Sequence, residues 1–596
     1  MVLKPPFFVC FAVCLIVSVA GCNSNNQTSL PVSIAVSPQS AGIATGQTFQ
    51  FTAMVTNNLT GITSPATGNS GPMAVRWKAT GGKIDDNGNF TASSEAASTT
   101  VFVTATSAED HTKYATATVH VVAPGQVSTT ANPQVANYSL APGAAGNVSV
   151  QFGPDTNYGL TTWAQPSTAG EAVSLFVAGM KADTPYHMRA MVQFGDGTQF
   201  VDSDHVFTTS AVTPSQAPPI TATTTAGMTP QGGVELLDLV TGTSRPTVTD
   251  LSGNVLWTYT GGPNGPVPNP VKLLPNGHFL INFSEGSTDG LNSVIQEVDL
   301  TGKLIWQMAA ADLNKALAAA TCAGCNITVI GTHHDFVQLP NGHLVVIAAT
   351  QQVISGTTVT GDVLIDLDEN HNPVWLWNEF DHLDTNRRPY LWPDWTHTNA
   401  ILYSPDDGNL IISIRHQNWL VKVDYANGAG AGDILWHLGY QGDFALVGGT
   451  DPTDWFYAQH GPSFITANTT GQFGLALFDN GDDRVFPSDV TCGTTGAPPC
   501  LYSTVPLLQI DEASMTATLT FNPTTPTYSF FGGNAAVLAN GNVEYCEAAG
   551  GPTGASGTIY EVTQDSSVQT VWQMQVSDVY AYRGQRIPSL YPGIQW

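Results

Sequence analysis

The chain has 596 residues, of which 11% are charged, and its 46 acidic and 18 basic side chains give a formal net charge of −28. This length exceeds that of a single domain, and 58 glycines with many short apolar runs are typical of a turn-rich, all-β protein. The acidic balance excludes a basic face for nucleic acid, so no nucleic-acid partner is expected. Because the overall field repels anions, an anionic ligand would need local cationic groups within about one Debye length, roughly 8–10 Å.

The first 21 residues resemble the leader of an exported protein. Lys4 precedes an apolar run at 7–20, which suits a signal-peptide core and is too short to span a bilayer. Small residues before Cys22 are typical of a lipoprotein signal, in which the cysteine carries the lipid; ordinary secretion with cleavage nearby is the alternative. We therefore predict a lipoprotein signal peptide at 1–21, an anchor cysteine with a polar tether at 22–29, and a place in the cell envelope, in the periplasm or at the outer membrane.

Two segments that follow alternate apolar and polar residues, as half-buried strands do. Residues 30–123 place Trp77 centrally and carry a hairpin signal at 81–88, which is typical of a bacterial Ig-like domain. Residues 125–213 predict a second β-sandwich of Ig-like or fibronectin-like type, and the Thr- and Pro-rich stretch 208–225 is typical of a linker. Neither segment holds a cluster suited to catalysis, so we expect spacers or packing partners.

From residue 214 to the end, the sequence repeats a turn that ends in glycine and opens a short apolar strand. The turns lie at 230–233, 275–277, 340–342, 405–408, 468–471 and 539–541. Most repeats close on an acid, a turn and a tryptophan, namely Trp257, Trp306, Trp375, Trp436 and Trp572. Phe521 takes this place in the fifth repeat, and the turn glycines are 44 to 70 residues apart. This spacing suits four-stranded blades with inserted loops, so we predict a six-bladed β-propeller at 214–596 with tryptophans packed between blades.

Two cysteine pairs in this region are candidates for local disulfides. They are Cys322 with Cys325, and Cys492 with Cys500. An oxidising compartment favours such bridges across long loops. A metal clip is the alternative for the first pair, but no second pair with ligand spacing completes it. Cys546 is left over and is expected to be a buried strand residue.

Three histidines stand at nearly the same place in three consecutive repeats. His334, His397 and His460 lie 8, 11 and 11 residues before the glycine of the following turn. Equivalent positions in a ring of repeats face its axis, so these side chains are expected to converge on one pocket. Arg415 follows on a strand of the middle repeat. Imidazoles gathered with a guanidinium are suited to chemistry on an anion.

Three kinds of site remain open for this cluster. A metal site would use neutral imidazoles, with Asp335 beside His334 as a further ligand. A binding site for sulfate or phosphate would use Arg415 and protonated histidines. Nucleophilic catalysis would use one neutral imidazole as the nucleophile and a second, protonated one to assist the leaving oxygen, while Arg415 holds the oxygens of the transferred group.

A set of short motifs occurs in one order along the repeats. They are THHDF at 332–336, DWTHTN at 394–399, SIR at 413–415, QHGP at 459–462, YR at 582–583 and IPSLY at 587–591. Together they resemble the bacterial arylsulfotransferase family, enzymes that transfer sulfate between phenols without a nucleotide sulfate donor. The resemblance covers about 125–596, because the family carries a β-sandwich before its six-bladed propeller, and it leaves 30–123 outside.

The resemblance implies a role for each of the clustered side chains. His460 would be the nucleophile that becomes a transient sulfohistidine, while His397, Arg415 and His334 would bind the sulfuryl oxygens and stabilise their charge. His334 or His397 would also pass a proton to the departing phenolate. Adjacent side chains of a strand face opposite sides, so of His333 and His334 only the latter is expected to face the channel.

The resemblance also implies the partners of the reaction. A phenolic sulfate donor and a phenol acceptor would react in turn, with no cofactor and no metal, and a homodimer is a candidate state of assembly. Asn399 is a candidate substrate contact, with a strand-end hydrogen bond as the alternative. Aromatic residues near the mouth are candidates to sandwich the aryl ring: Trp392, Trp395, Trp419, Tyr457 and Phe531.

The sequence is also compatible with two other classes of protein. One is a non-catalytic cell-surface propeller that serves as a binding module for adhesion or carbohydrate. The other is a metal- or quinone-dependent propeller enzyme, which the lack of an adjacent-cysteine pair and of an acidic calcium cluster disfavours. Between Arg415 and His460 there is also no cysteine pair, where some arylsulfotransferases have a disulfide, so no disulfide requirement is carried over.

Overall fold

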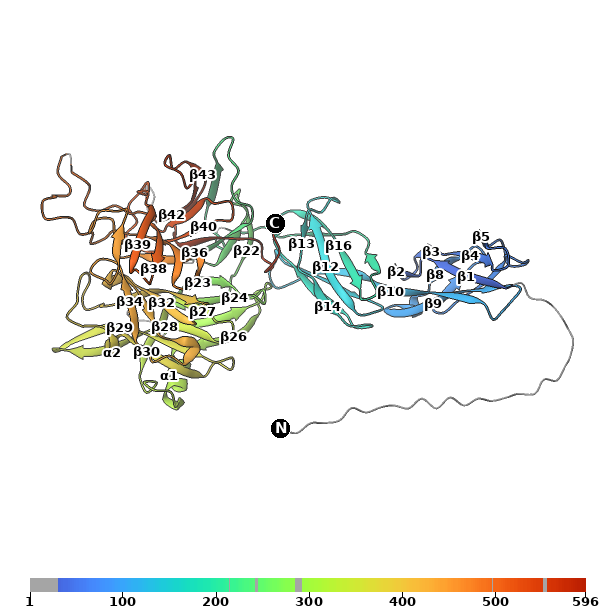
Figure 1. The fold of residues 1–596 in the computed structure, drawn as a ribbon, viewed down its shortest axis with the longest axis horizontal. Coiled ribbons are helices and arrows are strands. Elements are labelled where there is room, and N and C mark those ends of the chain that lie inside the picture. The colour runs from blue at the N-terminus through green and yellow to red at the C-terminus, as the bar shows by residue number, and fades with distance from the viewer. Residues whose placement is uncertain (1–30, 214, 242–244, 285–291, 496, 550–554) are drawn as a thin grey trace. The chain divides into compact units, whose positions relative to one another are not determined.

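The computed structural model describes residues 31–213, 215–241, 245–284, 292–495, 497–549 and 555–596. The described chain is mostly β, and nearly all of its strand pairs are antiparallel (Figure 1). It divides into two compact units, Met1–Val122 and Ala123–Trp596. Cys22 and the rest of the predicted leader and tether lie outside the described residues. Among the helices of the described segments, none has the length and apolar character that a membrane span requires.

The first unit consists of short strands on which buried and exposed side chains alternate. Its elements are β1 (Val32–Ser37), β2 (Ser40–Ala44), β3 (Thr48–Gln50), β4 (Thr52–Asn57), β5 (Ile62–Pro65), β6 (Val75–Ala79), β7 (Gly82–Ile84), β8 (Asn89–Ala92), η1 (Ser94–Ala96), β9 (Thr99–Ser107) and the start of β10 (Tyr114–Thr129). Strand β4 pairs with β1 and β5, β8 with β3 and β7, and β9 with β6 and β10. Phe51, Phe90 and Val103 are fully buried in the core that these strands share. The alternation of the sequence thus comes from sheets that bury one face.

The second unit begins with a further group of paired strands. They are β11 (Ala136–Ala141), β12 (Gly146–Gly153), β13 (Leu160–Thr161), β14 (Gln165–Ser167), β15 (Val173–Val177), β16 (Pro185–Phe194), β17 (Gln199–Val201) and β18 (His205–Thr208). Strand β12 pairs with β16, and β11 pairs with β15. The C-terminal segment binds to this group: the Tyr591 hydroxyl donates to Phe176 O at 2.7 Å, and the Trp596 indole donates to Thr161 O at 3.1 Å.

The described residues between 215 and 596 form six sheets of four or five strands. In pairing order, the first holds β22 (Val255–Thr258), β21 (Thr247–Thr249), β20 (Val234–Val240) and β44 (Tyr580–Ile587); the second β23 (Val267–Leu273), β24 (Phe279–Ser284), β25 (Val294–Val298) and β26 (Leu304–Ala309); the third β27 (Val329–Gln338), β28 (Leu344–Ile354), β29 (Thr357–Leu367) and β30 (Pro373–Asn378). The fourth holds β31 (Thr398–Ser404), β32 (Asn409–Ile414), β33 (Trp419–Val423) and β34 (Ile434–Leu438); the fifth β36 (His460–Thr469), β37 (Gln472–Phe478), β38 (Leu507–Asp511), β39 (Thr516–Phe521) and β35 (Ala445–Val447); the sixth β40 (Asn534–Val537), β41 (Val543–Glu547), β42 (Ser556–Val562), β43 (Thr570–Ser577) and β19 (Ile220–Thr224). Two short helices, α1 (Ala310–Ala319) and α2 (Glu379–His382), lie between sheets, and η2 (Arg415–Gln417) and η3 (Ala426–Gly428) lie between strands of the fourth sheet.

Each sheet contacts the next sheet along the chain. The most extensive of these contacts join β20 to β23, β24 to β27, β27 to β31, β31 to β36, β36 to β40, and β41 back to β44 of the first sheet. The two ends of this segment are interlocked, because β44 pairs with β20 and β19 pairs with β43. The contacts therefore close into a cycle. The segment that forms this cycle is coloured from green to red in Figure 1.

In the first, third and sixth sheets, a tryptophan indole donates a hydrogen bond to a turn of the next sheet. The indoles of Trp257, Trp377 and Trp572 donate to the main-chain oxygens of Leu300, Gly432 and Leu251 at 2.7–2.8 Å. In the third sheet this donor is Trp377 and not Trp375, whose ring instead meets Tyr425 of the fourth sheet edge-on at 4.9 Å. A buried indole needs an acceptor for its N–H, and a turn of the neighbouring sheet supplies it.

A buried ionic cluster joins the first sheet to the sixth. Arg586 of β44 lies 3.0 Å from Glu235 and 3.2 Å from both Glu544 and Glu561. Burial and then the charge of Glu235 raise the pKa of Glu544 well above its usual range, so Glu544 is held protonated. A single guanidinium thereby serves three buried carboxyl groups where the ends of the cycle meet.

Two disulfides bridge loops of this segment. Cys322 is joined to Cys325 shortly after α1, and Cys492 is joined to Cys500 in the connection between β37 and β38. Cys546 is free and buried in β41. Structural disulfides are typical of proteins that work outside the cytoplasm.

Candidate active site

The three histidines singled out by the sequence lie at irregular points of adjacent strands. His334 lies within β27, His397 directly precedes β31, and His460 begins β36. The pairing register of all three strands shifts beside these residues. His334 and His397 also adopt left-handed φ angles of 58° and 53°, which are uncommon for residues with a side chain. Bulges of this kind redirect side chains at functional sites.

Two of these histidines, His334 and His397, line a cavity of about 610 Å³, whereas His460 is not among its lining residues. The cavity is lined by Val240, Gly265, Val267, Asn269, Ser284, His334, His397, Arg415, Phe531 and Tyr582. The His334 ring lies 4.7 Å from the His397 ring, and the Tyr582 ring lies 5.9 Å from His334 and 6.0 Å from His460. Two histidines and one arginine thus line one cavity, and His460 lies next to Tyr582, which lines it too.

His460 is held in one tautomer by an amide. Its Nδ1 lies 2.7 Å from Asn480 Oδ1 and 3.2 Å from Ala458 O. The Asn480 amide nitrogen donates to two main-chain oxygens, so its oxygen must face the ring. Both neighbours of Nδ1 are acceptors; Nδ1 therefore carries the hydrogen and Nε2 keeps its lone pair. Burial, followed by the charge of Arg415, lowers the pKa of His460 well below its usual value, which keeps the imidazole neutral.

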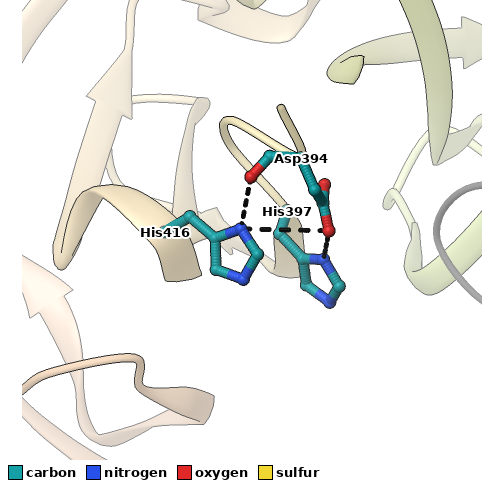
Figure 2. Close-up of side chains that lie close together, drawn as sticks. All are labelled: Asp394, His397 and His416. Atoms are coloured by element: carbon teal, nitrogen blue, oxygen red, sulfur yellow. Dashed lines mark hydrogen bonds and ion pairs between the residues drawn. The ribbon is translucent and has the colours of Figure 1, made fainter. Parts of the chain in front are cut away.

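His397 has a carboxylate as its partner instead. Figure 2 shows its Nδ1 bound to Asp394 Oδ2, at 2.6 Å, with His416 beside the pair. Burial opposes ionisation of Asp394, but the attraction of His397 outweighs it and holds the pKa of Asp394 below its usual range. An ionised carboxylate at this distance stabilises positive charge on the His397 ring, which the amide next to His460 does not do.

Asp394, His397 and His416 form the cluster of the described residues that comes nearest to a metal site. Their donor atoms lie within 4.8 Å of one another. A metal ion lies in the plane of each imidazole that binds it, yet the two rings are stacked at 4.5 Å with an angle of 28° between their planes. The Nδ1 of His416 is also engaged by Asp394 O at 2.7 Å (Figure 2). This arrangement suits a hydrogen-bonded network better than coordination.

Arg415 is fixed on one side by several acceptors. Its Nη2 donates to Asp482 Oδ2 and to Phe530 O, both at 2.9 Å, and its Nη1 lies 3.4 Å from His416 Nε2. Burial lowers the pKa of His416 to about 2, so this ring is neutral and faces the guanidinium with a lone pair. Arg415 Nε has no hydrogen-bond partner in the described structure. The side chain is thus positioned by the protein and keeps donor capacity for a ligand.

Asp335 is paired with two cations. Its carboxylate lies 2.5 Å from Lys272 Nζ and 3.4 Å from Arg583 Nη1, and it accepts a hydrogen bond from Ile401 N. Arg583 Nη2 in turn donates to Asn399 O at 2.8 Å. These cations lie around residues of the site, and they supply the local positive charge that the acidic chain as a whole lacks.

Asn399 is buried and connects two of the strands that carry histidines. Its amide donates to Gln459 O at 2.7 Å, next to His460, and it is not among the residues lining the cavity. Of the aromatic residues expected near the mouth, Phe531 lines the cavity, whereas Trp395 and Tyr457 are fully buried elsewhere.

The sequence analysis assigned no role to several residues that lie at the site. Asp394 is three residues before His397 in a motif already noted, and this short spacing is a usable signal. Tyr582 also lies in a noted motif, and burial raises its pKa to about 12, so it remains a phenol. Asn480 and Asp482 lie in a loop after β37, and no sequence pattern connects them to His460 or Arg415.

A family model described as Arylsulfotransferase (ASST) matches residues 222–583, and no curated protein matches the chain. Three solved structures are similar in part. A GH74 xyloglucanase from Xanthomonas campestris has 12% identity and a TM-score of 0.22, with 77% of this chain and 71% of the other covered. A bacterial ice-binding adhesin has 13% identity, a TM-score of 0.12 and coverages of 56% and 97%; an ICAM-5 D1–D4 ectodomain fragment has 11%, 0.15, 57% and 99%. These TM-scores are too low to support an argument about fold or function.

Proposed function

The chain belongs to the arylsulfotransferase (ASST) family, a family of aryl-sulfate sulfotransferases. From this premise we propose that it moves a sulfuryl group from an aryl sulfate to a phenol by a ping-pong mechanism, through a sulfohistidine at His460. The observation that carries the proposal is the state of His460: a neutral ring whose Nδ1–H is held by Asn480. An imidazole in this tautomer has its Nε2 lone pair available for attack.

In the first half-reaction, His460 Nε2 attacks the sulfur and the bond from sulfur to the phenol oxygen breaks. Arg415 and His397 bind the sulfuryl oxygens, because a fixed guanidinium and a ring paired with Asp394 can both face negative charge in the cavity. The departing phenolate takes a proton from His334 or His397. Positioned donors of this kind supply most of the rate enhancement in transfers of such groups.

In the second half-reaction, a phenol acceptor takes the place of the released phenol. It gives its proton to the same cavity histidine, and its oxygen attacks the sulfur of the sulfohistidine. The electron pair of the sulfur–nitrogen bond returns to His460 Nε2. Phe531 and Tyr582 line the cavity and are suited to contact the aryl rings. Asn399 is proposed to support this geometry by tying the strand of His397 to that of His460.

The family implies a β-propeller, and the closed cycle of sheets supports six blades at 214–596. We propose that a β-sandwich at 125–213 and an Ig-like domain at 30–123 precede it. The disulfides and the family indicate a place outside the cytoplasm. Attachment to the membrane through Cys22, in the periplasm or at the outer membrane, is proposed from the sequence pattern, and the homodimer remains a prediction.

The central test is to trap the covalent intermediate. The protein is mixed with a phenyl sulfate that has a chromogenic leaving group, without an acceptor, and its intact mass is measured. We expect one added SO₃ group, which peptide mapping assigns to His460, and its loss when phenol is added. An unmodified protein that nevertheless turns over aryl sulfate would contradict the covalent mechanism.

The partner of His460 gives a prediction for the pH dependence. Asn480→Asp places a carboxylate at Nδ1, which stabilises the imidazolium and raises the pKa of His460. Because only the neutral ring attacks, the acidic limb of the profile of kcat/KM against pH should move to higher pH, with at least about a tenfold loss near pH 6. Asn480→Ala is the control: it should lower the rate without moving this limb. An unmoved limb in the aspartate variant would refute the assigned role of Asn480.

A further inference from the structure

His333 lies directly behind His334 and contacts it. The two Nδ1 atoms are 2.6 Å apart, and the rings are nearly perpendicular, with an angle of 88° between their planes. In a regular strand these neighbours would face opposite sides, but the left-handed φ of His334 and the register shift between Thr332 and Phe336 bring the rings together. At this distance one nitrogen must donate and the other must accept.

His333 is connected at its other nitrogen to a buried carboxylate. His333 Nε2 lies 2.9 Å from Asp362 Oδ1, and both residues are at most 2% exposed. The second oxygen of Asp362 accepts from Thr398 N at 2.6 Å and from Thr396 Oγ1 at 3.0 Å. Burial, and then the charge of Asp362, raise the pKa of nearby Glu379 well above its usual range, so Glu379 is held protonated beside Asp362.

We propose that Asp362, His333 and His334 form a proton relay that serves the phenol hydroxyl in the cavity, with His333 as a positioning residue that does not touch substrate. The inference rests on the proposed sulfuryl transfer and selects His334 over His397 as the acid and base of that reaction. In the free enzyme the extra proton lies on His333, and in the sulfo-enzyme, after the first phenol has left with that proton, the remaining hydrogens lie on His333 Nε2 and His334 Nδ1. His334 Nε2 then presents a lone pair to the cavity.

The relay operates in the second half-reaction as follows. The O–H bond of the acceptor phenol breaks and a bond from its proton to His334 Nε2 forms. At the same time the His334 Nδ1–H bond breaks and a His333 Nδ1–H bond forms, so the positive charge comes to rest on His333 beside Asp362. The phenolate attacks sulfur and the pair of the broken sulfur–nitrogen bond returns to His460. The reverse proton movement serves the departing donor.

The surroundings of His334 explain why it needs a second ring. Burial, and then the charges of His397, His333, His460 and Arg415, lower the pKa of His334 well below its usual value. A proton kept on this ring would therefore be unfavourable. Transfer to His333 moves the charge away from the sulfuryl site and places it against a carboxylate that three donors hold in position.

The test is His333→Gln, measured in single turnovers of sulfo-enzyme with a series of phenols. Phenols that keep their proton at the assay pH, with a pKa near about 10, need a base, so their transfer should slow about 100-fold. Phenols already ionised at that pH need none, and their transfer should change less than about threefold. His343→Gln is the matched control, because His343 pairs with Asp366 in the same sheet without lining the cavity. Equal slowing of all phenols, or no slowing, would overturn the relay.

A second readout does not depend on turnover. The short bond between the two imidazoles should give a downfield N–H proton signal in the NMR spectrum of the wild-type protein, and this signal should be missing in His333→Gln. Its absence from the wild type, or its persistence in the variant, would refute the relay. Failure of the sulfuryl-transfer proposal itself would appear separately, as an unlabelled His460 in the wild type with the downfield signal present.

Discussion

His460→Ala should lower kcat/KM for transfer from a chromogenic phenyl sulfate to phenol by about 100,000-fold or more. The variant loses the atom that forms the covalent bond, and the ordered release of one phenol before the next binds has no route without it. The pocket left behind still holds Arg415 and His397, so substrate binding should weaken far less than turnover. A nucleophile that works with a preorganised set of donors typically accounts for losses of this size.

The measurement is the burst of the coloured phenol in the first turnover, followed with and without acceptor. His437→Ala is a suitable control, because His437 pairs with Asp443 on β34 and does not line the cavity. The control should give the wild-type burst, whereas His460→Ala should give none. A burst of normal amplitude in His460→Ala would show that another group accepts the sulfuryl group.

Arg415→Ala should lower kcat by about 1,000-fold, and Arg415→Lys by about 100-fold. The guanidinium is held by Asp482 and Phe530 on one side, and its Nε has no partner in the described structure. Lysine keeps the charge and loses the planar fork, so the difference between the two variants separates geometry from charge. Negative charge on the sulfuryl oxygens must be balanced most strongly in the transition state, and the loss should therefore fall on kcat more than on KM.

Steady-state kinetics with both substrates varied would check this division. Arg189→Ala is a suitable control, because Arg189 stacks on Tyr158 in the strands before the cycle of sheets. Unfolding of each variant should be followed in parallel, since the Asp482 side chain is only 3% exposed and would be left without its cation. A change confined to KM in Arg415→Ala would mean that the guanidinium binds the ground state and does not stabilise the transition state.

The sequence was sufficient for the family and for the β character of the chain, because both depend on local patterns. The ordered motifs predicted the arylsulfotransferase family, and the family match confirms this prediction. Short apolar runs between turns predicted strands, and the structure is mostly β. The sequence pointed to Trp375 in the third repeat, and this ring contacts Tyr425 of the next sheet. The sequence did not single out Trp377, which lies on the same side of β30 and donates to Gly432, because only packing decides which indole reaches that acceptor.

The roles of the individual site residues stay predictions, although the structure places His334, His397, Arg415 and His460 near one cavity. Their gathering follows from repetition: equivalent positions of adjacent sheets end up side by side. The expectation that His333 would have no part in the site was drawn from the strict alternation of a strand. A left-handed residue at His334 breaks that alternation, and no local sequence signal marked it.

What the sequence by itself determined is the chemistry available: imidazoles and a guanidinium at matching places in a repeating β chain. What only the tertiary structure decided is the hydrogen-bond partner that each of those groups faces. An amide faces His460, a carboxylate faces His397, and a second histidine backed by Asp362 faces His334. Asn480 and Asp362 lie 20 and 29 residues from the rings they contact, and burial sets the strength of each contact. Both conditions arise only when strands distant in sequence pack together and exclude water.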